Sequence, residues 1–336
     1  MAAAKRRVVV TQRYFDQATI DYLKENNCEV DILDLPKGKA DANLTPDELK
    51  AVLAGAGGWI VGHAHVTREL LQDLPDLAVI SRRGVGYERV DVDAVRDLGR
   101  VVTIAAGGND ASVADHTVGL MLAVGRRLRE TQNRMLAGDW TILISSDLNR
   151  KTVGIIGLGR IGRSVVQRLA GFNCRVLVYD PHPDADYARS QGVTFCDVET
   201  ILHESDYISL HAPLVAATRN LIGAKALALM KPTAIVINAA RGGLVDDRAL
   251  LQALKEGRLA GAGLDVYLSE SDKSLTEVTA ELIALPNVVA TPHSAASSLE
   301  GLARTNMVAA RSVVAVLDGG DPPEACVIAD GRARLR

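Results

Sequence analysis

The sequence predicts an α/β fold with two Rossmann-like domains, one of them inserted into the other. Strand-length apolar runs alternate with short helical patterns over the first hundred residues, which is typical of a parallel sheet covered by helices on both faces. A second run of this kind begins at Lys151, and a long helical pattern follows its last strand. A chain of 336 residues is long for a single core. We therefore expect one domain from residues 1–104 and 298–336, a second from residues 105–297, and a substrate cleft between them.

The first domain is expected to consist of strand–helix units. Its strands are short apolar runs, and its helices carry apolar residues at helical spacing. The pair Thr45-Pro46 supplies a capping hydroxyl and a proline suited to a first turn, so a helix is expected to begin there. The expected strands are Arg7–Thr11, Val30–Leu33, Gly58–Val61 and Leu77–Ile80, and the expected helices are Asp16–Asn26, Thr45–Ala54 and Asp91–Leu98.

The connection to the second domain carries the longest continuous helical pattern, from Ser112 to Arg134. This pattern is apolar over more of its surface than packing on one domain requires, which indicates contact with a partner chain. Beyond it the sequence alternates between buried strands and helices. The expected strands are Val153–Ile156, Arg175–Asp180, Tyr207–His211, Ala234–Asn238, Gly261–Val266 and Val288–Ala290, and helices are expected at Arg163–Leu169 and Ser298–Leu317.

Composition and charge exclude several classes of protein. The chain has 48% hydrophobic residues and a formal net charge of −3, so no basic bias favours nucleic acid. Its apolar runs are of strand length, and none is long enough to cross a membrane. The four cysteines lack the spacing of a metal or redox site, and the N-terminus lacks the pattern of a signal peptide. We expect a cytoplasmic protein with reduced cysteines and no bound metal.

Three spaced glycines follow the first strand of the second domain. Gly157, Gly159 and Gly162 have the G-x-G-x-x-G spacing of dinucleotide-binding turns. The first permits a tight turn, the second lets a pyrophosphate approach the backbone, and the third lets helix and strand pack closely. The following helix N-terminus offers N–H groups and a partial positive charge to phosphates. A glycine motif alone is weak evidence, but here the preceding strand, the following helix and a later acidic residue agree with it.

That acidic residue, Asp180, ends the next strand, 18 residues after Gly162. A carboxylate there can accept hydrogen bonds from ribose hydroxyls and would repel a 2′-phosphate. Pro181, His182 and Pro183 follow, with no lysine or arginine to neutralise such a phosphate. An isolated loop carboxylate is often simply solvated, but its place after the glycine motif favours the cofactor interpretation. The sequence therefore predicts NAD rather than NADP.

Three residues suited to catalysis follow later strands of the second domain. Arg241 lies in a glycine-containing turn, where its guanidinium can bind a carboxylate through two hydrogen bonds. His293 can exchange a proton with a hydroxyl near neutral pH, and a carboxylate such as Glu270 beside it would raise its pKa. Six other histidines compete with His293, and a single arginine in a turn is more often only a surface residue. The residues alone leave these alternatives open.

Six segments along the chain share their pattern with one known family. They are Arg83-Gly-Val-Gly86-Tyr with Val90-Asp-Val-Asp93, Ser112-Val-Ala-Asp115, Gly154 to Gly162, Ser205 to Leu214, Asn238 to Asp246, and Thr291-Pro-His293. Together they resemble the D-isomer-specific 2-hydroxyacid dehydrogenase family over almost the whole chain, and most closely its short, D-3-phosphoglycerate-dehydrogenase-like members. The resemblance implies an NAD-dependent oxidoreductase that interconverts a 2-oxo acid and a D-2-hydroxy acid by hydride transfer. It also implies an NAD-binding doubly wound parallel sheet inserted into a flavodoxin-like substrate domain, and a homodimer formed through residues 112–148.

The resemblance also implies a role for each matching residue. Arg241 would bind the substrate carboxylate and carbonyl, and His293 with Glu270 would form the acid/base pair. The implied substrate site consists of Gly62, His63, Val85, Gly86 and Arg241, with the backbone N–H groups of Val85 and Gly86 holding the carboxylate. The implied cofactor site consists of Gly157, Gly159, Arg160, Ile161, Gly162, Asp180, His211, Pro213, Thr218, Ala239, Arg241, Asp265, His293 and Ala295.

The chain departs from the family pattern in several places, and two of them concern the acid/base pair and the substrate loop. Ser271 follows Glu270 where the family usually has proline, so we expect the loop to differ, with Asp272 as the next candidate partner of the histidine. The substrate loop carries His63 and His65 where phosphoglycerate enzymes often have Arg-Ser. The prediction of a phosphorylated substrate is therefore less secure, and the two imidazoles could instead bind an acidic or hydroxylated end of the substrate.

Three alternatives compete with this function. Phosphite oxidation is less expected because Val85 stands where a lysine is needed, and formate oxidation is disfavoured because formate enzymes resemble this pattern with glutamine in place of Glu270. An NAD(H)-sensing scaffold or corepressor resembling the C-terminal binding proteins is also open, since those proteins keep the catalytic triplet. We expect no disordered tails of the kind that usually accompany a scaffolding role, and this expectation favours an enzyme.

Overall fold

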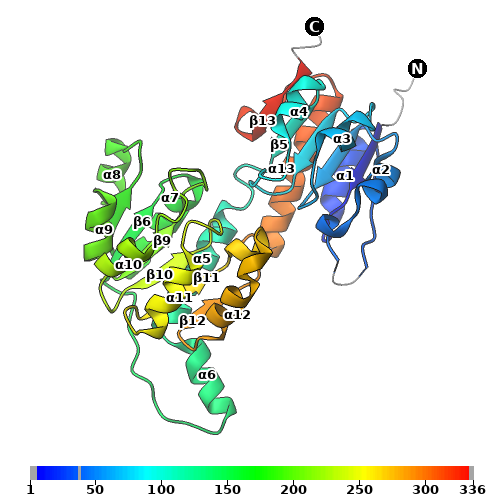
Figure 1. Cartoon of the computed structure of the whole chain (residues 1–336). Coiled ribbons are helices and arrows are strands. Elements are labelled where there is room, and N and C mark those ends of the chain that lie inside the picture. The colour runs from blue at the N-terminus through cyan, green and yellow to red at the C-terminus, as the bar shows by residue number, and fades with distance from the viewer. Residues whose placement is uncertain (1–5, 37–38, 333–336) are drawn as a thin grey trace. The chain divides into compact units, whose positions relative to one another are not determined.

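The computed structural model describes residues 6–36 and 39–332 of the chain (Figure 1). It divides into two compact units: unit 1 is Met1–Asn109 with Ser297–Arg336, and unit 2 is Asp110–Ala296. The first division falls at Asn109 rather than at residue 104 because the intervening residues pack within unit 1. The Ala105 N–H donates to the Gly84 carbonyl at 2.8 Å, and Arg304 Nε donates to the Gly108 carbonyl at 3.0 Å.

Unit 1 is built on a six-stranded sheet in the order β13-β5-β4-β3-β1-β2. The strands are β1 (Arg6–Val10), β2 (Cys28–Ile32), β3 (Gly58–Val61), β4 (Val79–Arg82), β5 (Val101–Ile104) and β13 (Val327–Asp330). β1 to β5 are parallel, in the flavodoxin-like order, while β13 pairs antiparallel with β5 at the edge. This confirms the expected flavodoxin-like class. β5 and β13 are not among the expected strands.

Alternate side chains of the unit 1 strands enter two separate cores. Val8 and Val10 pack on one face with α1 and α13, whereas Val9 and the fully buried Trp59 pack on the other with α2 to α4. This follows from the two-residue period of a strand. The helices are α1 (Gln17–Glu25), α2 (Pro46–Leu53), α3 (Arg68–Gln72), α4 (Val92–Asp97) and α13 (Leu299–Leu317).

Unit 2 is built on seven parallel strands in the order β12-β11-β10-β9-β6-β7-β8. They are β6 (Thr152–Ile156), β7 (Arg175–Tyr179), β8 (Thr194–Phe195), β9 (Tyr207–Leu210), β10 (Ile235–Asn238), β11 (Gly261–Leu264) and β12 (Val288–Ala290). The order reverses between β6 and β9, so the sheet is doubly wound as expected. The helices are α5 (Asp110–Gly125), α6 (Leu128–Leu136), α7 (Arg160–Leu169), α8 (Ala185–Gln191), α9 (Val198–Glu204), α10 (Ala224–Leu229), α11 (Asp247–Lys255) and α12 (Thr276–Ala284).

The single helix expected from Ser112 to Arg134 is wrong. The structure has two helices there, because Arg127 adopts a left-handed conformation with φ of 52° and interrupts the hydrogen-bonding pattern. α5 packs in the core of unit 2, while α6 has no buried side chain among its residues and extends from the rest of that unit (Figure 1). Within the described part of the chain, no helix has the length and apolarity needed to cross a membrane.

Candidate active site

The residues expected to bind the cofactor lie at one edge of the unit 2 sheet. The carboxyl ends of parallel strands meet at the same edge, and doubly wound sheets bind ligands there, where the strand order reverses. Each candidate lies in the segment after one strand of this sheet. The segment after β6 carries Gly157, Gly159, Arg160, Ile161 and Gly162; the segment after β7 carries Asp180; and the segment after β9 carries His211, Pro213 and Thr218. The segment after β10 carries Ala239 and Arg241; the segment after β11 carries Asp265; and the segment after β12 carries His293 and Ala295. The structure therefore brings all the candidates of unit 2 to this edge.

The glycine turn after β6 has the geometry that a dinucleotide requires. Gly157 has φ of +99°, and a Cβ there would lie 2.7 Å from the His211 backbone. A Cβ at Gly162 would lie 2.3 Å from the Gly157 carbonyl oxygen, so only glycine lets helix and turn approach this closely. A Cβ at Gly159, in contrast, would meet no atom within 4 Å. The second glycine therefore faces open space, as expected where a pyrophosphate approaches the backbone.

Asp180 lies directly beside this turn. Its Oδ2 accepts a hydrogen bond from the Leu158 N–H at 2.7 Å, and its Oδ1 accepts one from the His182 N–H at 2.9 Å. α7 begins next to it with Gly159 as its N-cap residue and no side-chain cap. A fixed negative charge and an uncapped helix N-terminus thus stand side by side, which fits a ribose next to a pyrophosphate.

Apolar side chains from three strand ends complete this edge of the unit 2 sheet, which we call the cofactor edge. Ala239 and Ala295 form one cluster with Val113 of α5, and Ile161 packs against it. In the loop after β9, Thr218 Oγ1 donates to the Pro213 carbonyl at 2.6 Å and closes the loop. His211 Nε2 is hydrogen-bonded to Ser209 Oγ at 2.9 Å, and burial lowers the pKa of His211 to about 4, so its imidazole is uncharged at neutral pH.

The two residues expected to form the acid/base pair are in direct contact. His293 Nδ1 lies 2.7 Å from Glu270 Oε2. This hydrogen bond raises the pKa of His293; burial opposes it, the charges of Glu270 and Asp265 reinforce it, and that of Arg241 weakens it. His293 has φ of 53°, a left-handed conformation that non-glycine residues rarely adopt and that is common at functional sites. Although Ser271 replaces the usual proline, Glu270 keeps this position.

Asp272, the next candidate partner of the histidine, is engaged elsewhere. Its carboxylate accepts a hydrogen bond from the Ser274 N–H at 3.0 Å and caps a short 3₁₀ helix, Lys273–Leu275. Hydrogen bonds from the side chain of Ser274 and, second, from its N–H lower the pKa of Asp272. The geometry therefore favours Glu270 over Asp272 beside His293.

Two residues that no sequence pattern singles out support Glu270. The Tyr267 N–H donates to Glu270 Oε1 at 2.8 Å, so both carboxylate oxygens of Glu270 have partners. Asp247, at the start of α11, accepts the Leu268 N–H at 3.1 Å and holds the same turn. Burial raises the pKa of Asp247 to about 6, with the charges of Asp246 and Glu270 contributing.

Asp265 organises the segment that carries the histidine. It is only 1% exposed, and its Oδ1 accepts the Thr291 hydroxyl at 2.6 Å. Its two oxygens also accept the N–H groups of Ser294 and Ala295, at 2.8 and 2.9 Å. His116 Nε2 is 2.9 Å from Thr291 Oγ1 and adds a histidine that the sequence does not distinguish from the others. Asp265 therefore fixes the backbone on both sides of His293.

Arg241 projects from a turn that the sequence makes rigid. Asn238 Nδ2 donates to the Arg241 carbonyl at 2.9 Å, and its Oδ1 accepts the Ala240 N–H at 3.1 Å. A Cβ at Gly242 would lie 2.3 Å from the Tyr267 backbone, so the turn packs against the residues that precede Glu270. This links the arginine turn to the loop of the acid/base pair within unit 2.

The other candidates for substrate binding belong to unit 1. Gly62 and His63 follow β3, while Val85 and Gly86 follow β4. The backbone N–H groups of Gly62 and His63 donate to the buried carboxylate of Asp41, at 2.7 and 2.9 Å. A substrate contact at this loop would therefore use the His63 side chain, because the backbone donors are already engaged.

Comparison with known proteins shows the family to which the chain belongs. The family described as D-isomer specific 2-hydroxyacid dehydrogenase, NAD binding domain, matches residues 118–295. The D-3-phosphoglycerate dehydrogenase of Methanocaldococcus jannaschii is 38% identical over 280 residues, 82% of this chain and 52% of that protein. The glyoxylate reductase of Thermococcus litoralis is 38% identical over 267 residues, 77% of this chain and 79% of that protein. The chain belongs to the D-isomer-specific 2-hydroxyacid dehydrogenase family.

A solved structure shares this fold over nearly the whole chain. The TT0316 protein from Thermus thermophilus has a TM-score of 0.83 at 35% identity, covering 96% of this chain and 100% of that one. NAD is the cofactor of the matched domain, as the sequence predicted. The chain spans about half the length of the D-3-phosphoglycerate dehydrogenases that it matches. The named relatives are enzymes, so the corepressor alternative gains no support.

Proposed function

We propose that this family member is an NAD-dependent dehydrogenase that interconverts a 2-oxo acid and a D-2-hydroxy acid. The contact between His293 Nδ1 and Glu270 Oε2, at the cofactor edge of unit 2, is the observation that carries the proposal. A cofactor sensor resembling the C-terminal binding proteins keeps the same residues but needs no proton donor for its role. An oxidoreductase acting on a hydroxyl does need one, and a histidine with a raised pKa suits that role.

Each of the three residues would have a distinct part in the reaction. Bound NADH supplies the hydride for the carbonyl carbon. Arg241 binds the carboxylate with its planar guanidinium and polarises the carbonyl. Because Glu270 binds Nδ1, protonated His293 donates from Nε2 to the carbonyl oxygen, which becomes the hydroxyl. In the reverse direction neutral His293 accepts that proton, and Glu270 stabilises the imidazolium in both.

The cofactor roles of the remaining residues belong to the same proposal. Asp180 would bind the adenosine ribose, and Asp265 would contact the nicotinamide carboxamide. Unit 2 would thus be the NAD-binding domain and unit 1 the substrate-binding domain, with Val85 and Gly86 donating backbone N–H groups to the substrate. The support is the placement of each residue at a strand end, described above.

Turnover of NADH with a panel of 2-oxo acids tests the proposed activity. Glyoxylate, pyruvate, hydroxypyruvate, 2-oxoglutarate and 3-phosphohydroxypyruvate cover short, hydroxylated and acidic tails. We expect NADH oxidation with at least one of them and formation of the D enantiomer. Tight NADH binding without turnover of any acid would contradict the proposal and favour a sensor.

We also propose a homodimer formed through residues 112–148. α6 has no buried side chain, and the segment after it exposes Trp140, Ile142 and Ile144 by 75, 91 and 89%. Large apolar side chains clustered on one segment are typical of an interface. A second copy of the chain is the partner proposed, because identical surfaces pair most simply about a twofold axis.

A cytoplasmic location is part of the proposal as well. The four cysteines, Cys28, Cys174, Cys196 and Cys326, are free, and burial raises the pKa of the Cys28 and Cys174 thiols. Reduced, unreactive cysteines are typical of a reducing compartment.

A further inference from the structure

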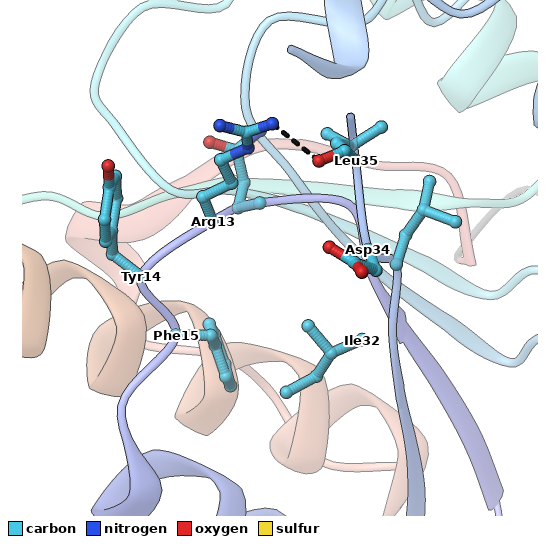
Figure 2. A pocket seen from close by; sticks show the side chains of 8 residues that line it. Arg13, Tyr14, Phe15, Ile32, Asp34 and Leu35 are labelled. Atoms are coloured by element: carbon cyan, nitrogen blue, oxygen red, sulfur yellow. Dashed lines mark hydrogen bonds between the residues drawn. The ribbon is translucent and has the colours of Figure 1, made fainter. Parts of the chain in front are cut away.

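Unit 1 contains a hollow of about 560 Å³ between the segments Gln12–Phe15 and Ile32–Leu35 (Figure 2). Figure 2 shows the Arg13 guanidinium directed to the Leu35 carbonyl, a hydrogen bond of 2.6 Å. Asp34 brings the opposite charge to the same lining. A cation that already binds the chain's own backbone, beside a carboxylate, selects no class of ligand. A more specific arrangement is present in unit 2, at the loop that carries the acid/base pair.

One histidine of α5 is hydrogen-bonded to that loop. His116 Nε2 lies 2.9 Å from the Oγ1 of Thr291, two residues before His293. The same nitrogen lies 3.7 Å from Asp265 Oδ1. The His116 side chain is 25% exposed, whereas that of Asp265 is 1% exposed. This contact joins residues 175 positions apart within unit 2, and the proposed reaction assigns no part to His116.

The Thr291 hydroxyl fixes the direction of this hydrogen bond. A hydroxyl has one proton to donate and two lone pairs with which to accept. Thr291 donates its proton to Asp265 Oδ1 at 2.6 Å, so it accepts the hydrogen bond from His116. His116 Nε2 therefore carries a proton, whether the imidazole is neutral or charged. The three side chains form a series of donors that ends on a buried carboxylate.

The carboxylate at the end of this series holds a strained backbone. His293 has φ of 53°, and residues in such conformations persist only where their surroundings hold them. The Asp265 carbonyl accepts the His293 N–H at 2.8 Å, and the Asp265 carboxylate accepts the Ser294 and Ala295 N–H groups at 2.8 and 2.9 Å. Asp265 thus holds the backbone from which the His293 imidazole projects.

α5 supports this series of hydrogen bonds with an apolar contact as well. Val113 and His116 are three residues apart, so they lie on the same face of the helix. Val113 is 4% exposed and belongs to one apolar cluster with Ala295. One face of α5 therefore holds residues 291–295 at both ends, by a hydrogen bond at the first and by apolar packing at the last.

Tyr267 connects the same threonine to the other half of the acid/base pair. Its hydroxyl donates to the Leu264 carbonyl at 2.9 Å and to the Thr291 carbonyl at 3.2 Å. Its N–H donates to the Glu270 carboxylate at 2.8 Å. A displacement of Thr291 would therefore reach Glu270 as well as His293.

We propose that His116 is a positioning residue of the acid/base site: by donating to Thr291 it holds Asp265, and through Asp265 it aligns the His293 imidazole for proton transfer. This inference rests on the proposed dehydrogenase function. His116 acts through its neighbours and takes no part in the proton transfer itself. A misplacement of about 1 Å at a reacting group can lower a rate about a hundredfold. His116 should therefore contribute to kcat rather than to substrate affinity.

Hydrogen–deuterium exchange of the full chain, followed by mass spectrometry, measures this hold independently of turnover. His116→Leu removes the donor and keeps an apolar side chain. The peptide that contains residues 291–296 should then exchange about tenfold faster, the effect of one lost hydrogen bond, while the melting temperature changes little. His203→Leu is the matched control, because it removes a histidine whose Nε2 lies 3.8 Å from Glu199 on α9, and it should leave this peptide unchanged.

Steady-state kinetics with NADH show whether the hold serves catalysis. With whichever acid of the panel named above turns over fastest, His116→Leu should lower kcat and kcat/KM together by about ten- to a hundredfold. His116→Gln places an amide N–H near the position of Nε2 and should recover part of both kcat and the protection from exchange. Thr291→Val breaks the series at its middle, so adding His116→Leu to it should cause no further loss.

The outcomes separate this inference from the proposed function. Unchanged exchange in His116→Leu, or faster exchange without a loss of kcat, overturns the positioning role. Additive losses in the double variant overturn it too, as does faster exchange throughout unit 2 that His116→Gln does not recover, because His116 would then only pack. All these results leave the dehydrogenase function standing. Absence of turnover of every acid by the unaltered protein overturns the dehydrogenase function, and the catalytic role of His116 with it, whatever the exchange rates.

Discussion

His293 Nδ1 is hydrogen-bonded to Glu270 Oε2 at 2.7 Å, across 23 residues of sequence. Neither partner is fully buried: 40% of the histidine side chain and 39% of the glutamate side chain are exposed. Hydrogen bonds nevertheless hold both partners in place. The Tyr267 N–H donates to the Glu270 carboxylate, and the His293 N–H donates to the Asp265 carbonyl at 2.8 Å. A proton donor whose orientation is set by its neighbours but whose surface reaches solvent suits a reaction with an incoming substrate.

Substitution of the pair should separate catalysis from cofactor binding. His293→Ala should reduce turnover by about 10²–10⁴-fold, the usual contribution of general acid–base catalysis, and leave NADH affinity nearly unchanged. NADH fluorescence titration beside steady-state kinetics checks both. A parallel loss of NADH affinity would mean that the substitution disturbs the cofactor edge.

Glu270→Gln should shift the pH profiles of both reduction and oxidation to lower pH. The Glu270 hydrogen bond raises the pKa of His293, so its charge-neutral replacement should lower that pKa. Reduction requires protonated His293, so its alkaline limb should move to lower pH; oxidation requires neutral His293, so its acidic limb should move the same way. Both rate profiles must be measured, because a lower rate alone could reflect a displaced loop. Unmoved limbs would show that Glu270 is not coupled to the titrating group.

Asp180 should control the choice between NAD and NADP. Its carboxylate is pinned by the Leu158 and His182 N–H groups, so a 2′-phosphate placed there would meet a fixed negative charge. The unaltered protein should therefore prefer NADH strongly. Asp180→Ala combined with Pro181→Arg should shift the ratio of kcat/KM toward NADPH by about tenfold or more, in line with one charge-assisted contact. Equal efficiency of the unaltered protein with both cofactors would remove Asp180 from this role.

Much of the fold followed from apolar runs and their spacing. Strands such as β6 and β10 are buried along most or all of their length and are visible as continuous apolar segments, as parallel strands usually are. β13 was missed because it is a short antiparallel edge strand with only one fully buried residue. The break at Arg127 was missed because neither glycine nor proline marks it.

The sequence alone predicts the cofactor residues of the site better than its acid/base residues. The glycine spacing and Asp180 are local patterns with a physical meaning, whereas Glu270 and His293 were selected by family resemblance. Asp41 could not have been found, because its partners lie at the ends of two strands that meet only in the folded sheet. The segment that carries Asp41 has no apolar period that would place it there.

The glycines of the cofactor turn should respond differently to the same substitution. Gly162→Ala forces a methyl group against the Gly157 carbonyl and should destabilise unit 2 by about 1–3 kcal/mol, typical of overpacking. Gly159→Ala meets no protein atom and should leave the melting temperature unchanged while weakening NADH binding. Gly171→Ala also meets no atom and serves as the control for both measurements. Loss of stability with Gly159→Ala would contradict an open space above this residue.

The apolar segment after α6 should determine the oligomeric state. Light scattering at micromolar concentration should give twice the mass of the chain. Ile142→Asp with Ile144→Asp should give the monomer, because two charges cannot be buried unpaired in an interface. Ile283→Asp is the control: Ile283 is also partly exposed, at 40%, but lies on α12, outside the proposed interface. A monomeric unaltered protein would rule out residues 112–148 as a stable interface.

Asp247 should make unit 2 more sensitive to alkaline pH than to mild acid. Burial raises its pKa from 3.8 to about 6, so the folded state binds this proton more tightly than the unfolded state does. The resulting destabilisation is absent below about pH 4, grows between about pH 4 and pH 6, and is complete above pH 6. Asp247→Asn keeps an acceptor for the Leu268 N–H and removes the charge.

The asparagine variant should therefore be more stable than the unaltered protein by up to about 3 kcal/mol at pH 8, given about 1.4 kcal/mol per pKa unit, and by about half as much at pH 5. Urea unfolding at the two pH values measures this difference. Asp272→Asn should show no such gain, because the pKa of Asp272 is lowered rather than raised. Asp247 also holds the turn that carries Glu270 through its hydrogen bond from the Leu268 N–H. The kcat of Asp247→Asn should therefore stay close to that of the unaltered protein only if the new amide oxygen accepts the same hydrogen bond. A gain in stability that is equal at both pH values would show that burial of this carboxylate is not its cause.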